Sequence, residues 1–143
     1  MKRRSLCLTL PLLAASPLAW AQSWPIKPIR LVVPFPAGGA TDLLARAIAQ
    51  GVGNAFGQPI VVDNRPGAGG TLGSAEVAKA LPDGHTLLMC TSSTHSIAPH
   101  LNPNLPYKVE ADFTPVAQVA NATNIVLVPK DLPVASIKEL IAY

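Results

Sequence analysis

The fold is decided by residues 29–42, which read IRLVVPFPAGGATD. The first five residues are apolar apart from one arginine, and most are β-branched, which is typical of a short buried strand. Residues 34–39 contain two prolines and two glycines and predict a tight turn. Thr41 and Asp42 then open a stretch with helical periodicity. The segment predicts a strand, a loop and a helix in direct succession.

The same order of elements recurs downstream. Residues 59–62 form a second β-branched run, 63–70 form a glycine-rich loop, and a helix is expected from 71 to 80. Residues 86–90 form a third apolar run, which leads into 91–95, a hydroxyl-dense loop. Strands and helices alternating at these spacings predict an α/β fold, with a parallel sheet flanked by helices and joined by right-handed crossovers.

The first helix is expected to pack one apolar stripe against this sheet, with Gly57 as its C-cap. The stripe consists of Leu44, Ala47, Ile48, Val52 and Ala55.

The first 21 residues have the pattern of a cleaved signal peptide. The basic residues 2–4 precede an apolar stretch over 6–20, and Ala19-Trp20-Ala21 is a small-x-small cleavage site. We expect export to the periplasm and a mature chain that begins at Gln22. A Sec signal is favoured, and the two arginines at 3 and 4 leave twin-arginine export open.

Charge argues against a nucleic-acid partner. The chain has 11 Lys and Arg against 8 Asp and Glu, and three of the positive residues lie in the leader. The mature chain is therefore balanced at eight against eight, and it lacks the basic surface that binding to phosphate backbones needs.

The second half of the chain predicts a change of domain. Residues 102–106 read as a surface connection, and 113–120 and 124–128 read as extended runs around a polar step at 121–123. We expect an incomplete first lobe over 22–121, and a crossover with the start of a second lobe over 122–143. A helix beginning near Ser136 is cut by the end of the sequence, which favours the front part of a longer protein or a fragmentary gene product.

Three loops are predicted to meet at the carboxyl edge of the sheet, where α/β proteins bind ligands. Two contain glycines and lead into helix N-termini, whose N–H groups and dipole favour a negative group. The third offers neutral hydroxyl groups. Leu72 stands where a dinucleotide fingerprint needs its third glycine, and no P-loop motif is present. A carboxylate is therefore the favoured anion.

The histidines and the mature chain's single cysteine give weak support for catalysis. His85 is expected in a solvated turn, and Cys90 in the core at the end of its strand. The spacing of Cys90, His95 and His100 matches no compact zinc pattern, so neither a metal nor another cofactor is predicted.

Two charged loop residues have competing roles. Asp42 fits a helix-dipole residue better than a general base. Arg65 is equally suited to clamp a carboxylate or to form an ion pair with Asp63 or another acid.

Three motifs together resemble a known family. They are KPIRLVVPFPAGGATD at 27–42, GQPIVVDNRPGAGG at 57–70 and PDGHTLL at 82–88. In this order they are similar to the periplasmic receptors of tripartite tricarboxylate transporters, the Bug family. The resemblance implies a two-lobed fold of the periplasmic-binding-protein type that closes on a small carboxylate. Family members are considerably longer, so it also implies that most of the second lobe is missing here.

By that resemblance, the loop at 35–41 and the segment at 91–95 hold the carboxylate, and the loop at 64–70 shapes the wall. The expected ligand-binding residues are Phe35, Ala37, Gly38, Gly39, Thr41, Asp42, Arg65, Gly67, Gly69, Gly70, Thr91, Ser92, Ser93, Thr94 and His95.

The sequence therefore predicts a non-enzymatic receptor that delivers a small carboxylate to a membrane permease with one large and one small subunit. Two alternatives stay open. One is a secreted α/β enzyme that acts on a carboxylated small molecule through Asp42 or His95, and the other is a non-functional truncated remnant.

Overall fold

The computed structural model describes residues 24–123 and 125–143. The chain divides into two compact units between Phe113 and Thr114. The predicted signal peptide, residues 1–21, lies outside the described residues. The predicted lobe boundary after residue 121 stays a prediction.

The first unit is built on a three-stranded parallel sheet. Its strands are β1 (Ile29–Val33), β2 (Ile60–Asn64) and β3 (Thr86–Leu88), in the order β2-β1-β3. Leu31 of β1 lies opposite Val62 of β2 and Leu87 of β3. The predicted α/β fold with a parallel sheet is confirmed.

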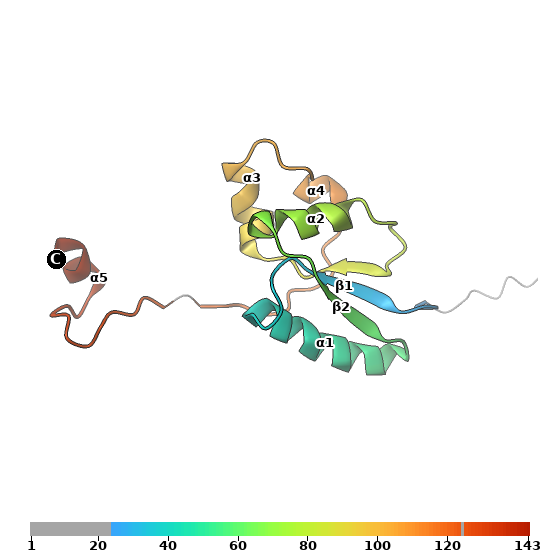
Figure 1. Ribbon diagram of the computed structural model, residues 1–143, viewed down its shortest axis with the longest axis horizontal. Helices are drawn as coiled ribbons and strands as arrows, with labels where there is room; N and C mark the ends of the chain where they lie inside the picture. Colours follow the sequence, from blue (N-terminus) through green and yellow to red (C-terminus); the bar gives the residue numbers. More distant parts are fainter. Residues whose placement is uncertain (1–23, 124) are drawn as a thin grey trace, which may run out of the picture. The chain divides into compact units, whose positions relative to one another are not determined.

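Two helices cover the two faces of this sheet (Figure 1). They are α1 (Ala40–Phe56), and α2 (Thr71–Ala78), which follows the short 3₁₀ turn η1 (Ala68–Gly70). Because β2 and β3 flank β1 on opposite sides, two crossovers of the same hand must place their helices on opposite faces. The central strand is consequently buried on both faces, with Ile29, Val32 and Val33 fully inaccessible.

The buried face of α1 differs from the predicted stripe. Asp42, Ala45 and Ala49 are buried. Of the predicted stripe, Ile48 and Val52 are half-buried, and Leu44, Ala47 and Ala55 are exposed. The Asp42 side chain bonds back to the loop before the helix and so fixes the rotation of its first turn. Small alanines then face the sheet and allow close packing. The predicted C-cap is confirmed, since Gly57 has a left-handed φ of 66°.

Residues 92–101 are helical, so the prediction of a loop at 91–95 is wrong for all but Thr91. The π-helical turn η2 (Ser93–Ile97) leads directly into α3 (Ala98–Leu101), and α4 (Val109–Asp112) follows. Tyr107 anchors this region, because its hydroxyl donates to the Thr94 carbonyl over 2.7 Å. A bond between residues so far apart in sequence cannot be read from local composition.

Two further side chains lie where the sequence did not place them. His85 is only 7% exposed, because its ring packs edge-on against Trp24, so the prediction of a solvated histidine is wrong. Cys90 is exposed, and the neighbouring Met89 occupies the core instead. The alternation of side chains along an extended segment explains this exchange.

Among its described residues, the second unit contains one helix, α5 (Ile137–Ala142). The expected cap is present, since the Ser136 hydroxyl accepts from the Glu139 amide over 3.2 Å. The described residues of the predicted extended runs at 113–120 and 124–128 form no strand, and no described residue of 114–143 is buried. None of the described helices has the length and apolar character needed to cross a bilayer.

Candidate functional site

The buried carboxylate of Asp42 stabilises the loop between β1 and α1. Asp42 is 1% exposed, and its Oδ2 accepts from the Gly38 amide and from Arg46 Nε, each over 2.9 Å. Its Oδ1 accepts from Asn64 Nδ2 over 2.9 Å. The Arg46 guanidinium, followed by the Gly38 amide and the Asn64 side chain, holds the pKa of Asp42 far below its ordinary value. Asp42 is therefore an anion that stabilises the loop from inside.

The two glycines of this loop have different tasks. Gly38 has a φ of +84°, and its N–H donates to the Asp42 carboxylate. Gly39 is the N-cap of α1 with an extended backbone, and no side chain caps the first amides of the helix. The N–H groups that follow Gly38 are thus the donors that this loop can offer to an anion.

The loop after β2 brings all three segments together at Gly70. This glycine has a φ of +93°, and a Cβ there would lie 2.7 Å from Thr94 Cγ2 and 3.2 Å from Phe35 Cζ. Phe35 follows β1 and Thr94 lies beyond β3, so only a residue without a side chain lets the segments approach this closely. The convergence expected from the sequence is present at this point.

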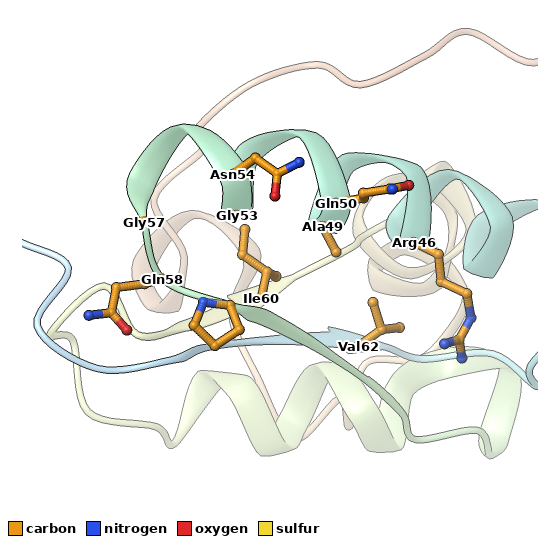
Figure 2. A pocket seen from close by; sticks show the side chains of 10 residues that line it. Arg46, Ala49, Gln50, Gly53, Asn54, Gly57, Gln58, Ile60 and Val62 are labelled. Carbon is orange, nitrogen blue, oxygen red and sulfur yellow. The ribbon is translucent and has the colours of Figure 1, made fainter.

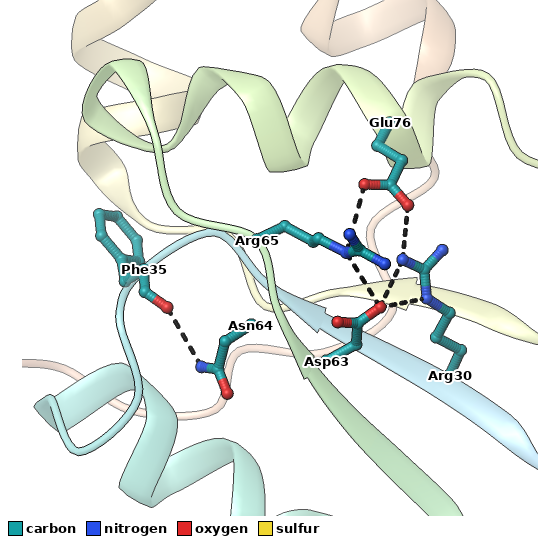
Figure 3. A network of polar contacts seen from close by, with 6 residues as sticks. All are labelled: Arg30, Phe35, Asp63, Asn64, Arg65 and Glu76. Carbon is teal, nitrogen blue, oxygen red and sulfur yellow. Dashed lines mark hydrogen bonds and ion pairs between the residues drawn. The ribbon is translucent and has the colours of Figure 1, made fainter.

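Arg65 lies in an ion network rather than alone (Figure 3). Its Nε is 3.1 Å from Asp63 Oδ2 and 3.6 Å from Glu76 Oε2. Arg30 contacts the same two carboxylates, and it is the principal reason that the pKa of Asp63 lies below its ordinary value. Of the two roles considered for Arg65, the structure shows the ion pair.

The segment after β3 exposes only part of its hydroxyl groups. Thr94 is fully buried, and its Oγ1 bonds to the Thr91 amide and carbonyl. Ser92 and Ser93 are exposed. Thr91 Oγ1 is buried and finds no hydrogen-bond partner among the described residues. Thr94 therefore shapes this segment, and its exposed hydroxyl groups are those of Ser92 and Ser93.

His95 belongs to an aromatic cluster with Tyr107 and Phe113. Its ring lies 5.8 Å from Tyr107 and 4.7 Å from Phe113, centroid to centroid. Its Nδ1 is 2.9 Å from Thr94 Oγ1. Burial lowers the pKa of His95, so the ring is neutral near pH 7.

In the described residues, neither a metal cluster nor the groove beside α1 involves the predicted ligand site. Within residues 24–123 and 125–143, no three His, Cys, Asp or Glu side chains are grouped so as to hold a metal ion. A groove of about 680 Å³ runs between α1 and β2, and Figure 2 shows Arg46, Gln50 and Ile60 along it. None of the residues predicted to bind ligand lines this groove.

The sequence placed Asn64 only at the start of the wall-shaping loop at 64–70 and did not mark it as a residue of the site in its own right. Its Nδ2 donates to the Phe35 carbonyl over 3.1 Å as well as to Asp42, and its Oδ1 accepts from Arg46. The available signal was its place at the end of a strand, inside the most glycine-rich motif of the chain.

A parallel α/β unit whose loops meet beyond the strand ends is typical of ligand-binding α/β proteins, and the lobes of extracytoplasmic receptors are one class of these. The model of the tripartite tricarboxylate transporter family receptor matches residues 44–143. The chain therefore belongs to this family, which confirms the resemblance carried by the three motifs.

Individual relatives agree with this assignment. BugT of Bordetella pertussis is 41% identical over 129 residues, which are 90% of this chain and 39% of that protein. A structure from R. palustris with adipate has a TM-score of 0.75 at 41% identity, covering 84% of this chain and 40% of that one. MatC from Rhodopseudomonas palustris with bound malate has a TM-score of 0.65 at 47% identity, covering 67% and 33%. The chain spans 39–42% of the length of three curated relatives that it matches.

Proposed function

We propose that this protein is the ligand-capturing part of a periplasmic receptor for a small carboxylate, and that it performs no chemistry on its ligand. The observation that carries the proposal is the convergence of the three segments at Gly70. In a sheet of order β2-β1-β3, the chain changes direction between β1 and β3, and ligands of α/β proteins bind at such a switch point. The loop at 35–41 and the segment at 91–95 follow these two strands.

The charges around the site favour neutral donors for the carboxylate. Arg46 is paired with Asp42, and Arg30 and Arg65 are paired with Asp63 and Glu76. The ligand would therefore be bound by amides at the start of α1 and by the hydroxyls of Ser92 and Ser93. Hydrogen bonds from several neutral donors stabilise a carboxylate without the desolvation of a bare cation.

The relatives favour a dicarboxylate as ligand, since two similar structures contain adipate and malate. In the proposed mechanism, ligand binds a closed arrangement of two lobes better than the open one, and the closed receptor is recognised by a permease with one large and one small subunit. Export by the predicted signal peptide at 1–21 places the receptor in the periplasm.

Titration calorimetry tests this proposal. The complete gene product, with any residues encoded beyond Tyr143, is titrated with malate, adipate and an uncharged diol of similar length. We expect binding of at least one acid, no binding of the diol, and recovery of the acid unchanged. Chemical conversion of the acid would favour the secreted enzyme, and failure to bind either acid by a folded protein would favour the non-functional remnant.

A further inference from the structure

One half-buried amide ties together three elements of the site. Asn64 ends β2, and its Nδ2 donates to the Phe35 carbonyl in the β1 loop and to Asp42 Oδ1 on α1. Its Oδ1 accepts from Arg46 Nη2 over 3.1 Å. Both hydrogens of the amide are used, and its oxygen is engaged as well.

The partners also fix the orientation of this amide. With oxygen and nitrogen exchanged, the amide oxygen would face a carbonyl and a carboxylate, and the NH₂ group would face a guanidinium. Only a short side chain with two donors and one acceptor satisfies all three neighbours. Aspartate has the same shape but lacks the donors, and alanine has neither.

We infer that Asn64 is a positioning residue, which sets the β1 loop for ligand by bonding its carbonyl at Phe35 and the carboxylate beneath it, without touching the ligand itself. This inference rests on the proposed function, because the loop is the proposed donor surface. Without Asn64, Asp42 Oδ1 and the Phe35 carbonyl both lose their partner. The β1 loop and the start of α1 then lose their side-chain bonds to the end of β2.

The Asn64→Asp variant makes the inference testable through pH. At pH 8 it places a second carboxylate 2.9 Å from Asp42 Oδ1, and mutual repulsion raises the pKa of the pair. When the pair takes up one proton in weak acid, the protonated acid donates to Asp42 again, but it has no second hydrogen for the Phe35 carbonyl. The other charged groups near this pair are Arg46 on α1 and the Arg30, Asp63 and Arg65 network, which no contact joins to Asn64.

The experiment compares the wild type, Asn64→Asp and Asn64→Ala, with Asn54→Asp as the matched control, by calorimetry with malate and adipate at pH 8 and pH 5. Asn54 lies on α1 and is exposed. We expect wild type and control to bind alike at each pH. Asn64→Asp should bind about tenfold or more weakly than the wild type at pH 8 and regain part of that loss at pH 5, whereas Asn64→Ala should show the same loss at both.

Asn64→Asp binding like the wild type at pH 8, or showing the same loss of affinity at pH 5 as at pH 8 while folded by circular dichroism, overturns the inference. If that variant does not fold, wild-type affinity in Asn64→Ala overturns it instead. If the wild type binds neither acid, the proposed function fails, and the Gly38 amide chemical shift then decides about Asn64. A shift that titrates in weak acid in Asn64→Asp but not in the wild type supports the positioning role, and an invariant shift contradicts it.

Discussion

The loop after β1 and the segment after β3 lie at the same switch point but are built in opposite ways. In the first, a side chain completes the turn, because the Asp42 carboxylate accepts the Gly38 amide and leaves backbone donors facing outward. In the second, the backbone closes on itself, since the His95 and Thr94 amides both donate to the Thr91 carbonyl. The polar groups that this segment exposes are the side-chain hydroxyls of Ser92 and Ser93.

The difference shows under which conditions a protein carboxylate can lie close to a site for an anion. The one carboxylate beneath the β1 loop is buried and surrounded by donors, so its charge is compensated before a ligand arrives. The β3 segment needs no such compensation, because its interior group is the neutral Thr94. In the β1 loop, substitutions should therefore change binding when they remove the residues that support the loop. In the β3 segment, they should change binding when they remove its exposed side chains.

The largest effect is expected where the two regions meet. Gly70→Ala introduces a methyl group 2.7 Å from Thr94 Cγ2 at a positive φ, and we expect a loss of about 2–4 kcal/mol in the free energy of unfolding. Gly69→Ala is the matched control, because Gly69 also has a positive φ but an added Cβ meets nothing within 4 Å. Its loss should be about 1 kcal/mol. Urea denaturation measures both.

Equal losses in the two variants would contradict this account. They would mean that only backbone strain matters at these positions, and that Phe35 and Thr94 do not press on Gly70. The contact between the β1 loop and the β3 segment could then no longer serve as the basis of the proposed site.

A smaller effect, confined to binding, is expected from the β3 segment. Ser92→Ala removes an exposed hydroxyl, so stability should not change, but affinity for the cognate acid should fall about tenfold to a hundredfold, as expected for a hydrogen bond to a charged acceptor. Ser96→Ala is the control, because Ser96 is also exposed and engages His100 only through its backbone carbonyl. Calorimetry showing the same affinity for both variants would remove Ser92 from the site.

The sequence predicts the regular elements of this molecule better than the supports of its site. The β1 strand and the Gly57 cap follow from local composition, because β-branched runs and a glycine after a helix have a direct backbone cause. The rotation of α1 does not, since a polar anchor at Asp42 outweighs the apolar stripe. The helical turn at η2 depends on Tyr107, which lies thirteen residues from its partner Thr94.

Asn64 is a second example of a feature of the site that the sequence does not predict. Its residue type and position at a strand end are visible in the sequence, yet its three partners come from the β1 loop and from two turns of α1. No local pattern brings these groups together. The candidate list drawn from loops therefore contained the glycines that shape the site and omitted the amide that connects them.

The central claim is that uncharged donors bind the carboxylate and that the nearby arginines serve the fold. Calorimetry of Arg65→Gln with the acid that the wild type binds tests it most directly. The account predicts an affinity within about threefold of the wild type, because Arg30 still pairs with both Asp63 and Glu76 when Arg65 is gone. Abolished binding in a folded Arg65→Gln variant would contradict it, and would establish an arginine clamp in place of neutral donors.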